Sequence, residues 1–276
     1  MANWIENCIV NEKGRISALG IARFIFKIIL IKVMSRKSIF VRHNNYPHNS
    51  STQTGLWAGR IIDIAEKAFD HVITHSGHNE TTNRTYIPHP LYKFPVTVRN
   101  NKKSEHPRNY FLIFGRILPY KKIETLVNVI SPNVRVVIAG SAPDKAYVDY
   151  LCRLSAMKDI EIIPRYISDE EVLDIAKKSL GIVITHNDKN VIVSGTFFYA
   201  LSIGVPLYTV STPFFEWACR NLDLPQLYVE KDIQGLSELL ERRLKPHPPL
   251  DIAVKELIES LFGDEVIEKK WSKIIN

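Results

Sequence analysis

The chain has 276 residues and a formal net charge of +7, with 45% hydrophobic and 24% charged residues, so it is predicted to be a soluble globular protein long enough for two domains. Its three cysteines, Cys8, Cys152 and Cys219, lie far apart without a C-x-x-C pair, which argues against a disulfide framework or a structural zinc site and favours a reducing compartment. The positive charge is compatible with nucleic acid, anionic lipid or an anionic small molecule as partner.

The first predicted element is the apolar stretch Ile16–Met34, which Arg23, Lys27 and Lys32 interrupt. No uncharged run in it approaches the roughly 18 residues that a membrane span needs. It also lacks the layout of a signal peptide, since it continues directly into a strand-like segment, so a cytosolic protein is expected. Two interpretations stay open: a helix lying on an anionic membrane, or a core helix packed on a sheet with its cations turned outward.

From Ser38 onward, short β-branched runs alternate with helical patterns, which predicts an α/β fold with a parallel sheet covered on both faces. Strands are predicted at Ser38–His43, His71–Thr74, Arg84–Ile87, Tyr110–Phe114, Val134–Ala139, Ile160–Ile163, Gly181–Ile184 and Leu207–Val210. Helices are predicted at Leu56–Ala68, Ile123–Val129, Lys145–Met157, Asp169–Lys177, Gly195–Ser202, Ile233–Lys245 and Leu250–Ile274.

The polar, basic stretch Val98–Asn109 lacks periodicity and is the predicted linker. We therefore expect an N-terminal domain over residues 1–104 and a C-terminal domain over residues 105–276. The second block contains five predicted strands, enough for one doubly wound domain. In such sheets ligands bind beyond the carboxyl ends of the strands. The site is therefore predicted at the loops Gly115–Lys122, Arg165–Ser168 and Thr185–Thr196.

The loop Gly115–Lys122 follows the apolar strand FLIF and carries two cations. Gly115 permits a close backbone approach, Arg116 offers a planar fork for phosphate oxygens, and Lys121 offers a compact charge. The alternative is that both cations form a solvated surface pair.

The segment Val193–Pro206 is predicted to be a loop, a short helix and a glycine-proline turn into a strand. Its helix begins with Ser194, Gly195 and Thr196, whose free N–H groups and helix dipole favour a phosphate. An ordinary helix cap is the competing interpretation.

Four ordered motifs, GRILPYKK, VRVVIAGSAPD, IIPRYISDEEV and VSGTFFYALSIGVPL, resemble the C-terminal domain of GT-B glycosyltransferases. They look most like a branch of glycosyltransferase family four in bacterial exopolysaccharide and O-antigen assembly, including β-mannosyltransferase-like members. The match covers about Tyr110–Val210. FVRHNNYPHN, VITHS and YIPHPLY also resemble that branch and extend the similarity back to about Asn3.

The resemblance implies two Rossmann-like domains and transfer of a sugar from a nucleotide diphosphate sugar to a lipid-linked oligosaccharide or polysaccharide acceptor. It implies that Arg116 and Lys121 neutralise the diphosphate and that the amides of Ser194, Gly195 and Thr196 bind its oxygens, without metal or a further cofactor. The implied pathway is surface polysaccharide or lipopolysaccharide biosynthesis.

Two further site assignments rest on the same resemblance. Arg165 and Tyr166 resemble the loop that holds the nucleobase through backbone contacts, although Tyr166 could equally be a core residue. His43 would contact the donor sugar across the cleft or aid catalysis, whereas a lone strand histidine is often structural. His75 and His89 could line the same cleft, and no carboxylate lies at ligand spacing to make a metal site with these imidazoles.

The sequence departs from the family pattern in two places. Retaining members carry an E-x7-E pair, and its second glutamate commonly binds the nucleotide ribose. Val191 and Tyr199 occupy those positions here, so Tyr199 implies that the ribose is bound in another way. The resemblance to this branch favours inversion of the sugar's anomeric configuration, while both inversion and retention stay open from the residues themselves. The first block has only about 100 residues and begins like the interior of a GT-B domain, which predicts a reduced or a truncated N-terminal domain.

The leading hypothesis is therefore a metal-independent hexosyltransferase that is cytoplasmic and peripheral on the inner membrane face. The alternative is a catalytically inactive nucleotide-sugar-binding module or partner subunit. Nucleic acid is not an expected partner, because no helix-turn-helix, zinc or aromatic-basic module is recognisable.

Overall fold

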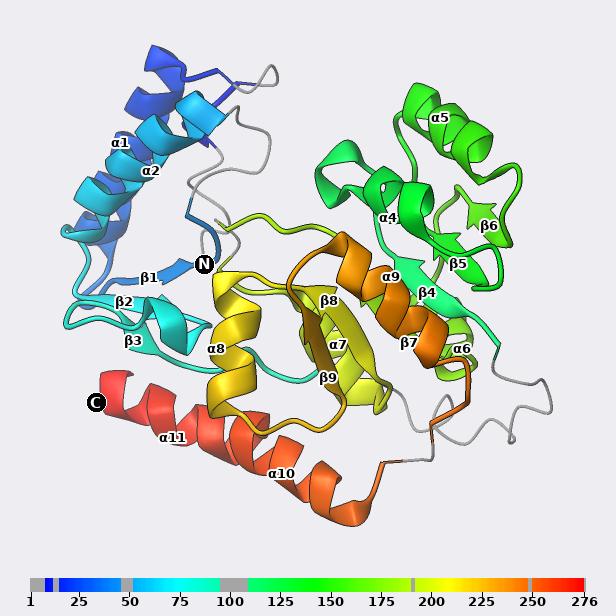
Figure 1. The fold of residues 1–276 in the computed structure, drawn as a ribbon. Helices are drawn as coiled ribbons and strands as arrows, with labels where there is room; N and C mark the ends of the chain where they lie inside the picture. Colours follow the sequence, from blue (N-terminus) through cyan, green and yellow to red (C-terminus); the bar gives the residue numbers. More distant parts are fainter. Residues whose placement is uncertain are drawn as a thin grey trace. The chain divides into compact units, whose positions relative to one another are not determined.

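The computed structural model describes residues 8–11, 15–45, 52–94, 109–189, 192–247 and 250–275 (Figure 1). The chain forms two compact units. The first comprises the described residues of Met1–His89, Lys189–Val193 and Ile267–Asn276, and the second those of Pro90–Asp188 and Ser194–Val266. The domain division expected between residues 104 and 105 lies outside the described residues, as does most of the predicted linker.

The first unit contains a parallel sheet in the order β1 (Ile39–Arg42), β2 (His71–Thr74) and β3 (Thr85–Tyr86). In its register Phe40 pairs with Val72 and Val41 pairs with Ile73. Because side chains alternate along a strand, the two pairs lie on opposite faces of the sheet.

Helices cover both faces of this sheet (Figure 1). Phe40 and Val72 share a core cluster with residues of α1 (Ala18–Met34) and α2 (Thr52–Glu66). Val41 and Ile73 pack with residues of α11 (Asp264–Ile275), whose last turns belong to this unit. The prediction of a helix over most of Ile16–Met34 is confirmed, with Ser17 as its N-cap.

The second unit contains a six-stranded parallel sheet in the order β6-β5-β4-β7-β8-β9. Its strands are β4 (Phe111–Phe114), β5 (Val136–Ala139), β6 (Ile160–Ile163), β7 (Gly181–Ile184), β8 (Leu207–Val210) and β9 (Leu227–Glu230). Its helices are α4 (Ile123–Val129), α5 (Lys145–Ser155), α6 (Asp169–Lys177), α7 (Gly195–Ile203), α8 (Pro213–Asn221), α9 (Ile233–Arg242) and α10 (Ile252–Phe262).

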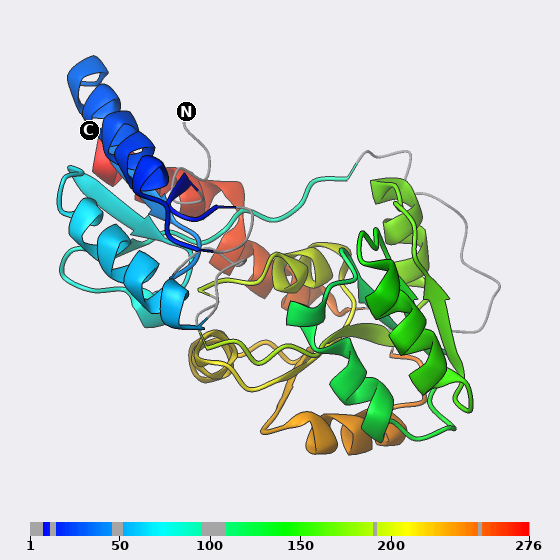
Figure 2. The ribbon, with the colours of Figure 1, turned by 90° about the horizontal axis from the view of Figure 1, so that it is seen from above.

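The strand order reverses direction between β4 and β7, which are hydrogen-bonded neighbours. Strands β5, β7 and β8 are buried along their whole length, as expected for parallel strands covered on both faces. The predicted α/β class and Rossmann-like architecture are confirmed. Figure 2 shows the same ribbon from above.

The structure corrects two predictions about the second unit. It has six strands rather than five, because β9 and the preceding α8 were not predicted; both are short, and the Pro213 that begins α8 was not read as a helix start. The segment Leu250–Ile274, predicted as one helix, is divided at Gly263 into α10 and α11. The apolar periodicity continues across this break, so periodicity alone did not reveal it.

None of the helices in the described part of the chain is long and apolar enough to cross a bilayer.

Candidate functional site

Two loops meet where the strand order of the second unit reverses. One follows β4 and carries Arg116 and Lys121, and the other follows β7 and leads to α7. The Thr185 hydroxyl donates to the Lys121 carbonyl at 2.5 Å, and Lys122 Nζ donates to Asn187 Oδ1 at 2.6 Å. The two predicted loops are thus tied together at the position where open α/β sheets bind ligands.

Lys121 has its ammonium half-buried in the first of these loops. Its Nζ donates to the Phe114 carbonyl at 2.8 Å and forms no ion pair with any described carboxylate. Burial lowers the pKa of Lys121 to about 8. Gly115 has a φ of +95°, and a Cβ added there would lie 2.9 Å from Lys121 Nζ. The glycine therefore provides both the turn and the space for the ammonium.

Arg116, in the same loop, is exposed, and within the described residues it forms no ion pair either. A buried cation is ordinarily paired, because desolvation of an isolated charge is costly, so the missing partner is informative for Lys121, whereas an exposed arginine such as Arg116 can be solvated. Two uncompensated cations in one loop at the sheet's ligand-binding edge are therefore suited to an anionic ligand.

The N-terminus of α7 is capped in the way the sequence predicts. Ser194 is buried, and its hydroxyl accepts from the Phe197 N–H at 3.4 Å. Among the described residues no acceptor is found for the N–H groups of Gly195 and Thr196. The ordinary cap and the anion site are compatible, since the cap uses Phe197 and leaves the first amides available.

An aromatic cluster joins α7 to the end of β4. The Tyr199 ring lies 4.8 Å from the ring of Phe114, whose carbonyl holds Lys121, and 5.5 Å from the ring of Tyr92. The Tyr199 hydroxyl is buried and has no hydrogen-bond partner in the described structure. Burial raises the pKa of Tyr199, so the hydroxyl stays protonated and is a hydrogen-bond donor without an acceptor among the described residues.

Tyr92 lies beside the candidate phosphate ligands, although it is not among the candidate residues predicted from the sequence. Its hydroxyl lies 3.2 Å from the position that a Cβ on Gly195 would take, so it is at the start of α7. Its backbone N–H donates to the Ser202 hydroxyl at 2.8 Å, which lays the segment along the helix. The signal was present, because Tyr92 ends the motif YIPHPLY.

Replacing Gly195 with leucine is expected to weaken nucleotide diphosphate binding about tenfold or more, because the side chain would cover the first amides of α7 and remove charged hydrogen bonds. Thermal stability should change little, because Gly195 is exposed. Isothermal titration with UDP measures the loss. Gly195→Ala is the control, since one methyl meets only the Tyr92 hydroxyl. Equal affinity of all three proteins would contradict a role for these amides.

Arg165 and Tyr166 lie on the loop after β6, an edge strand that β5 separates from β4. The Arg165 guanidinium forms an ion pair with Glu171, with Nη2 and Oε1 2.5 Å apart, on the protein surface. Tyr166 is 76% exposed, so the interpretation of Tyr166 as a core residue is wrong. Val191, at the first position of the missing glutamate pair, is outside the described residues.

In the first unit, His43, His75 and His89 form a row of imidazoles. The ring centroids of His43 and His75 are 5.4 Å apart, as are those of His75 and His89. His75 Nδ1 lies 2.9 Å from the Ile87 carbonyl oxygen. Because a carbonyl oxygen only accepts hydrogen bonds, the ring proton of neutral His75 is on Nδ1. Burial lowers the pKa of His75 to about 4 and also lowers that of His43, with His89 adding to both shifts. The imidazole of His43 is therefore neutral near pH 7 and able to accept a proton.

The segment that presents His43 is held by the preceding residue, Arg42. Its side chain is 3% exposed and donates to Asp63 at 2.5 Å and to Glu66 at 2.7 Å. It also donates to the carbonyls of Asn44 and Asn45, at 3.3 and 2.9 Å. The buried guanidinium of Arg42 thus holds the backbone of the two residues that follow His43. Within the described residues, no group of three His, Cys, Asp or Glu side chains is placed to hold a metal ion.

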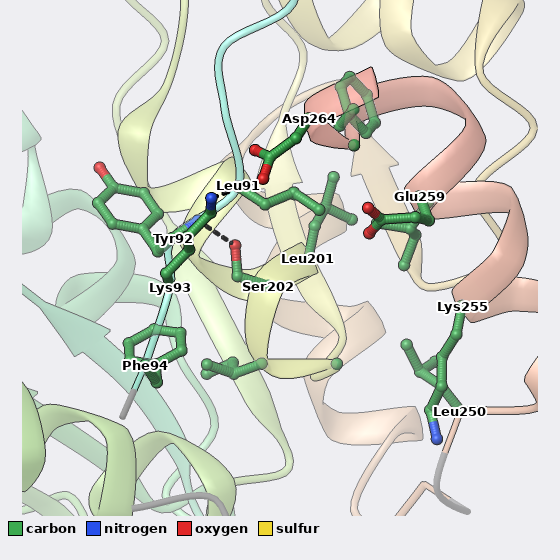
Figure 3. Close-up of a pocket in the computed structure, with 15 residues that line it drawn as sticks. Leu91, Tyr92, Lys93, Phe94, Leu201, Ser202, Leu250, Lys255, Glu259 and Asp264 are labelled. Atoms are coloured by element: carbon green, nitrogen blue, oxygen red, sulfur yellow. Dashed lines mark hydrogen bonds and ion pairs between the residues drawn. The ribbon is translucent and has the colours of Figure 1, made fainter. Parts of the chain in front are cut away.

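A groove of about 630 Å³ lies in the second unit, against the C-terminal part of α7 (Figure 3). Its lining includes Ser202, Lys255, Glu259 and Asp264. The candidate phosphate ligands lie at the other end of this helix, about 13 Å away for nine residues at 1.5 Å each. Tyr92 is common to both places, since it lines the groove and its hydroxyl lies at the start of α7.

Comparison with known proteins gives structural matches alone. No family model matches the sequence, and no curated protein matches it. Among solved structures, TarM of S. aureus, a variant bound to fondaparinux, alpha-GlcNAc-glycerol and UDP, superposes with a TM-score of 0.65 at 13% identity. This match covers 93% of the present chain and 54% of TarM, so the chain spans about half of TarM's length.

HepE of Anabaena in complex with UDP superposes with a TM-score of 0.66 at 13% identity, covering 94% of this chain and 76% of HepE. A glycosyltransferase from Rickettsia africae gives a TM-score of 0.62 at 11% identity, covering 94% of this chain and 74% of that one. The structures that this protein resembles are GT-B glycosyltransferases, and the likeness establishes the fold.

Proposed function

We propose that this protein is a glycosyltransferase that uses a nucleotide diphosphate sugar as donor. The observation that carries the proposal is the pair of uncompensated cations, Arg116 and Lys121, in a loop tied to the β7 loop where the sheet order reverses. A diphosphate supplies the missing negative charge. The UDP held by TarM and HepE supports a uracil nucleotide as the first donor class to test.

In this proposal Arg116 and Lys121 neutralise the charge that develops on the leaving diphosphate, and the amides of Ser194, Gly195 and Thr196 bind its oxygens. The scheme uses side-chain cations and needs no metal. The buried Tyr199 hydroxyl, without a partner in the described structure, is assigned to the nucleotide ribose. The exposed loop of Arg165 and Tyr166 is assigned to the nucleobase, through its backbone.

The proposed acceptor is a lipid-linked oligosaccharide or a polysaccharide used in surface polysaccharide synthesis on the cytoplasmic face of the membrane. The net charge of +7 supports peripheral contact with an anionic membrane. The glycan ligands in the TarM structure support a sugar acceptor.

We assign to His43 the role of general base. The neutral imidazole takes the proton of the acceptor hydroxyl, the hydroxyl oxygen forms the new bond to the sugar, and the bond from the sugar to the diphosphate breaks. His43→Ala is expected to lower turnover about a hundredfold or more. Turnover of radiolabelled sugar nucleotides measures this effect, and calorimetry with UDP measures donor affinity, which should stay unchanged.

His71→Ala is the matched control, since this histidine begins β2 and should leave turnover intact. Unchanged turnover in His43→Ala would remove His43 from the mechanism. The second candidate function is an inactive nucleotide-sugar-binding module, which Val191 and Tyr199 favour because they replace two family glutamates. Tight UDP binding without transfer to any glycan acceptor would support that alternative.

A further inference from the structure

The outer face of α1 is apolar and exposed, although this helix already buries its opposite side. Phe24 and Ile28 of α1 pack into the core of the first unit, with exposures of 1% and 8%. The outward side chains are between 44% and 79% exposed: Leu19, Phe26, Ile29, Leu30, Val33 and Met34. A contiguous apolar face that stays exposed on a helix is suited to a partner or a membrane.

Helical geometry places the charges of α1 beside this apolar face rather than in it. At 3.6 residues per turn, Val33 lies opposite Phe24, at the centre of the outer face. Arg23 and Lys27 lie along one edge of that face and Lys32 along the other, and α1 contains no acidic residue. Lys32 is paired with Asp70 at 3.0 Å and Lys27 Nζ donates to Cys8 Sγ at 3.1 Å, whereas Arg23 forms no ion pair with the described residues.

Helix α2 adds apolar side chains on the same side of the sheet. Leu56, Trp57 and Ile64 are between 54% and 69% exposed, and the Arg60 guanidinium lies over the Trp57 ring at 4.8 Å. Both helices bury their inner faces against the same sheet face, so their outer faces turn away from the sheet (Figure 1). The apolar surface is therefore shared by two helices.

We infer that the outer faces of α1 and α2 form a docking surface for an anionic lipid bilayer, with α1 lying in the interface. The apolar centre would enter the boundary of headgroups and acyl chains while Arg23 reaches lipid phosphates. Exposed tryptophan is enriched at that interface, and the long arginine side chain can keep its charged end in water there.

Charge distinguishes this occupant from a second copy of the chain. In a symmetric dimer built on this surface, the cationic edges of two identical α1 helices would meet without an acidic residue of α1 to pair with them. The exposed acid of α2, Asp63, is already paired with Arg42 and Arg84. Anionic headgroups supply that pairing. The inference rests on the proposed membrane contact of the transferase and names the surface that makes it.

Phe26→Ser together with Val33→Ser tests the apolar part of this surface. Cosedimentation of the 276-residue chain with vesicles of phosphatidylcholine and phosphatidylglycerol should weaken about a hundredfold, at roughly tenfold for each side chain. Ile252→Ser is the matched control, since Ile252 is 70% exposed on α10 in the second unit and should leave vesicle binding unchanged. Circular dichroism verifies that both variants fold.

Arg23→Gln tests the charged part and should weaken binding to the mixed vesicles about fivefold. Every variant should bind vesicles of pure phosphatidylcholine more weakly than the mixed vesicles, and Arg23→Gln should not alter that weaker binding. UDP affinity, measured on every variant, should match that of the unaltered chain, so a failed donor site and a failed docking surface are distinguishable. The inference is overturned if the unaltered chain does not bind the mixed vesicles, or if Phe26→Ser and Val33→Ser dissociate a dimer in sedimentation velocity without changing vesicle binding.

Discussion

Lys121→Met should weaken UDP binding about tenfold to a hundredfold, the loss expected when a charged hydrogen bond of roughly 1.5–3 kcal/mol is removed. Methionine keeps the aliphatic chain but removes an ammonium that has no carboxylate partner among the described residues. Isothermal titration near neutral pH measures the change. Arg116→Gln examines the second cation in the same assay. If both variants bind UDP as tightly as the unaltered chain, the loop is not the diphosphate site.

The same lysine predicts a pH dependence with a defined sign. Its pKa in the free protein is lowered to about 8, and a bound diphosphate favours the charged form. UDP affinity should therefore be constant below this pKa and fall as the pH rises above it, approaching about tenfold per pH unit. Lys121→Arg is the control. Because a guanidinium stays charged, the UDP affinity of this variant should not change with pH over the same range. A parallel decline in that variant would assign the titration to another group.

Arg42→Met should destabilise the first unit by about 3 to 5 kcal/mol, the cost typical of breaking a buried ion pair by removing one partner. The substitution leaves Glu66 8% exposed with Arg84 as its remaining cation, and releases the carbonyls of Asn44 and Asn45. Urea unfolding followed by fluorescence measures the shift, with Trp57 and Trp271 reporting on this unit.

The matched control is Arg84→Met, which removes the more exposed cation of the same network. Arg84 is 21% exposed and Arg42 remains paired with both carboxylates, so the expected cost is about 1 kcal/mol. Equal effects of the two substitutions would show that burial of Arg42 is not what stabilises the segment around His43.

Much of the fold was predictable because the strands of the second unit are continuous apolar runs. FLIF, GIVI and LYTV cannot be solvated on either face, and the alternation with amphipathic helices allows only a covered parallel sheet. The loops with Gly115, Arg116 and Lys121 and with Ser194, Gly195 and Thr196 were found by the same logic, since each follows such a strand. The break at Gly263 was missed because the apolar period runs through it.

Other features of the site depend on contacts between distant residues. The strand order placed the β4 and β7 loops side by side, which sequence spacing could not show, and it left Arg165 beyond the neighbouring strand β5. Tyr92 reaches the start of α7 although more than 100 residues separate them in the chain. The burial of Lys121, which lowers its pKa to about 8, is likewise a property of packing.

The sequence by itself determined which residues carry charge, which segments must be buried, and that glycine and small hydroxyl residues stand at the ends of strands. These properties are local, because they follow from side-chain chemistry and from periods of two and 3.6 residues. Only the tertiary structure decided which loops are neighbours, which cations lack a partner and which apolar faces stay uncovered. Those depend on the order of strands in the sheet, and residues adjacent in space there need not be adjacent in the chain.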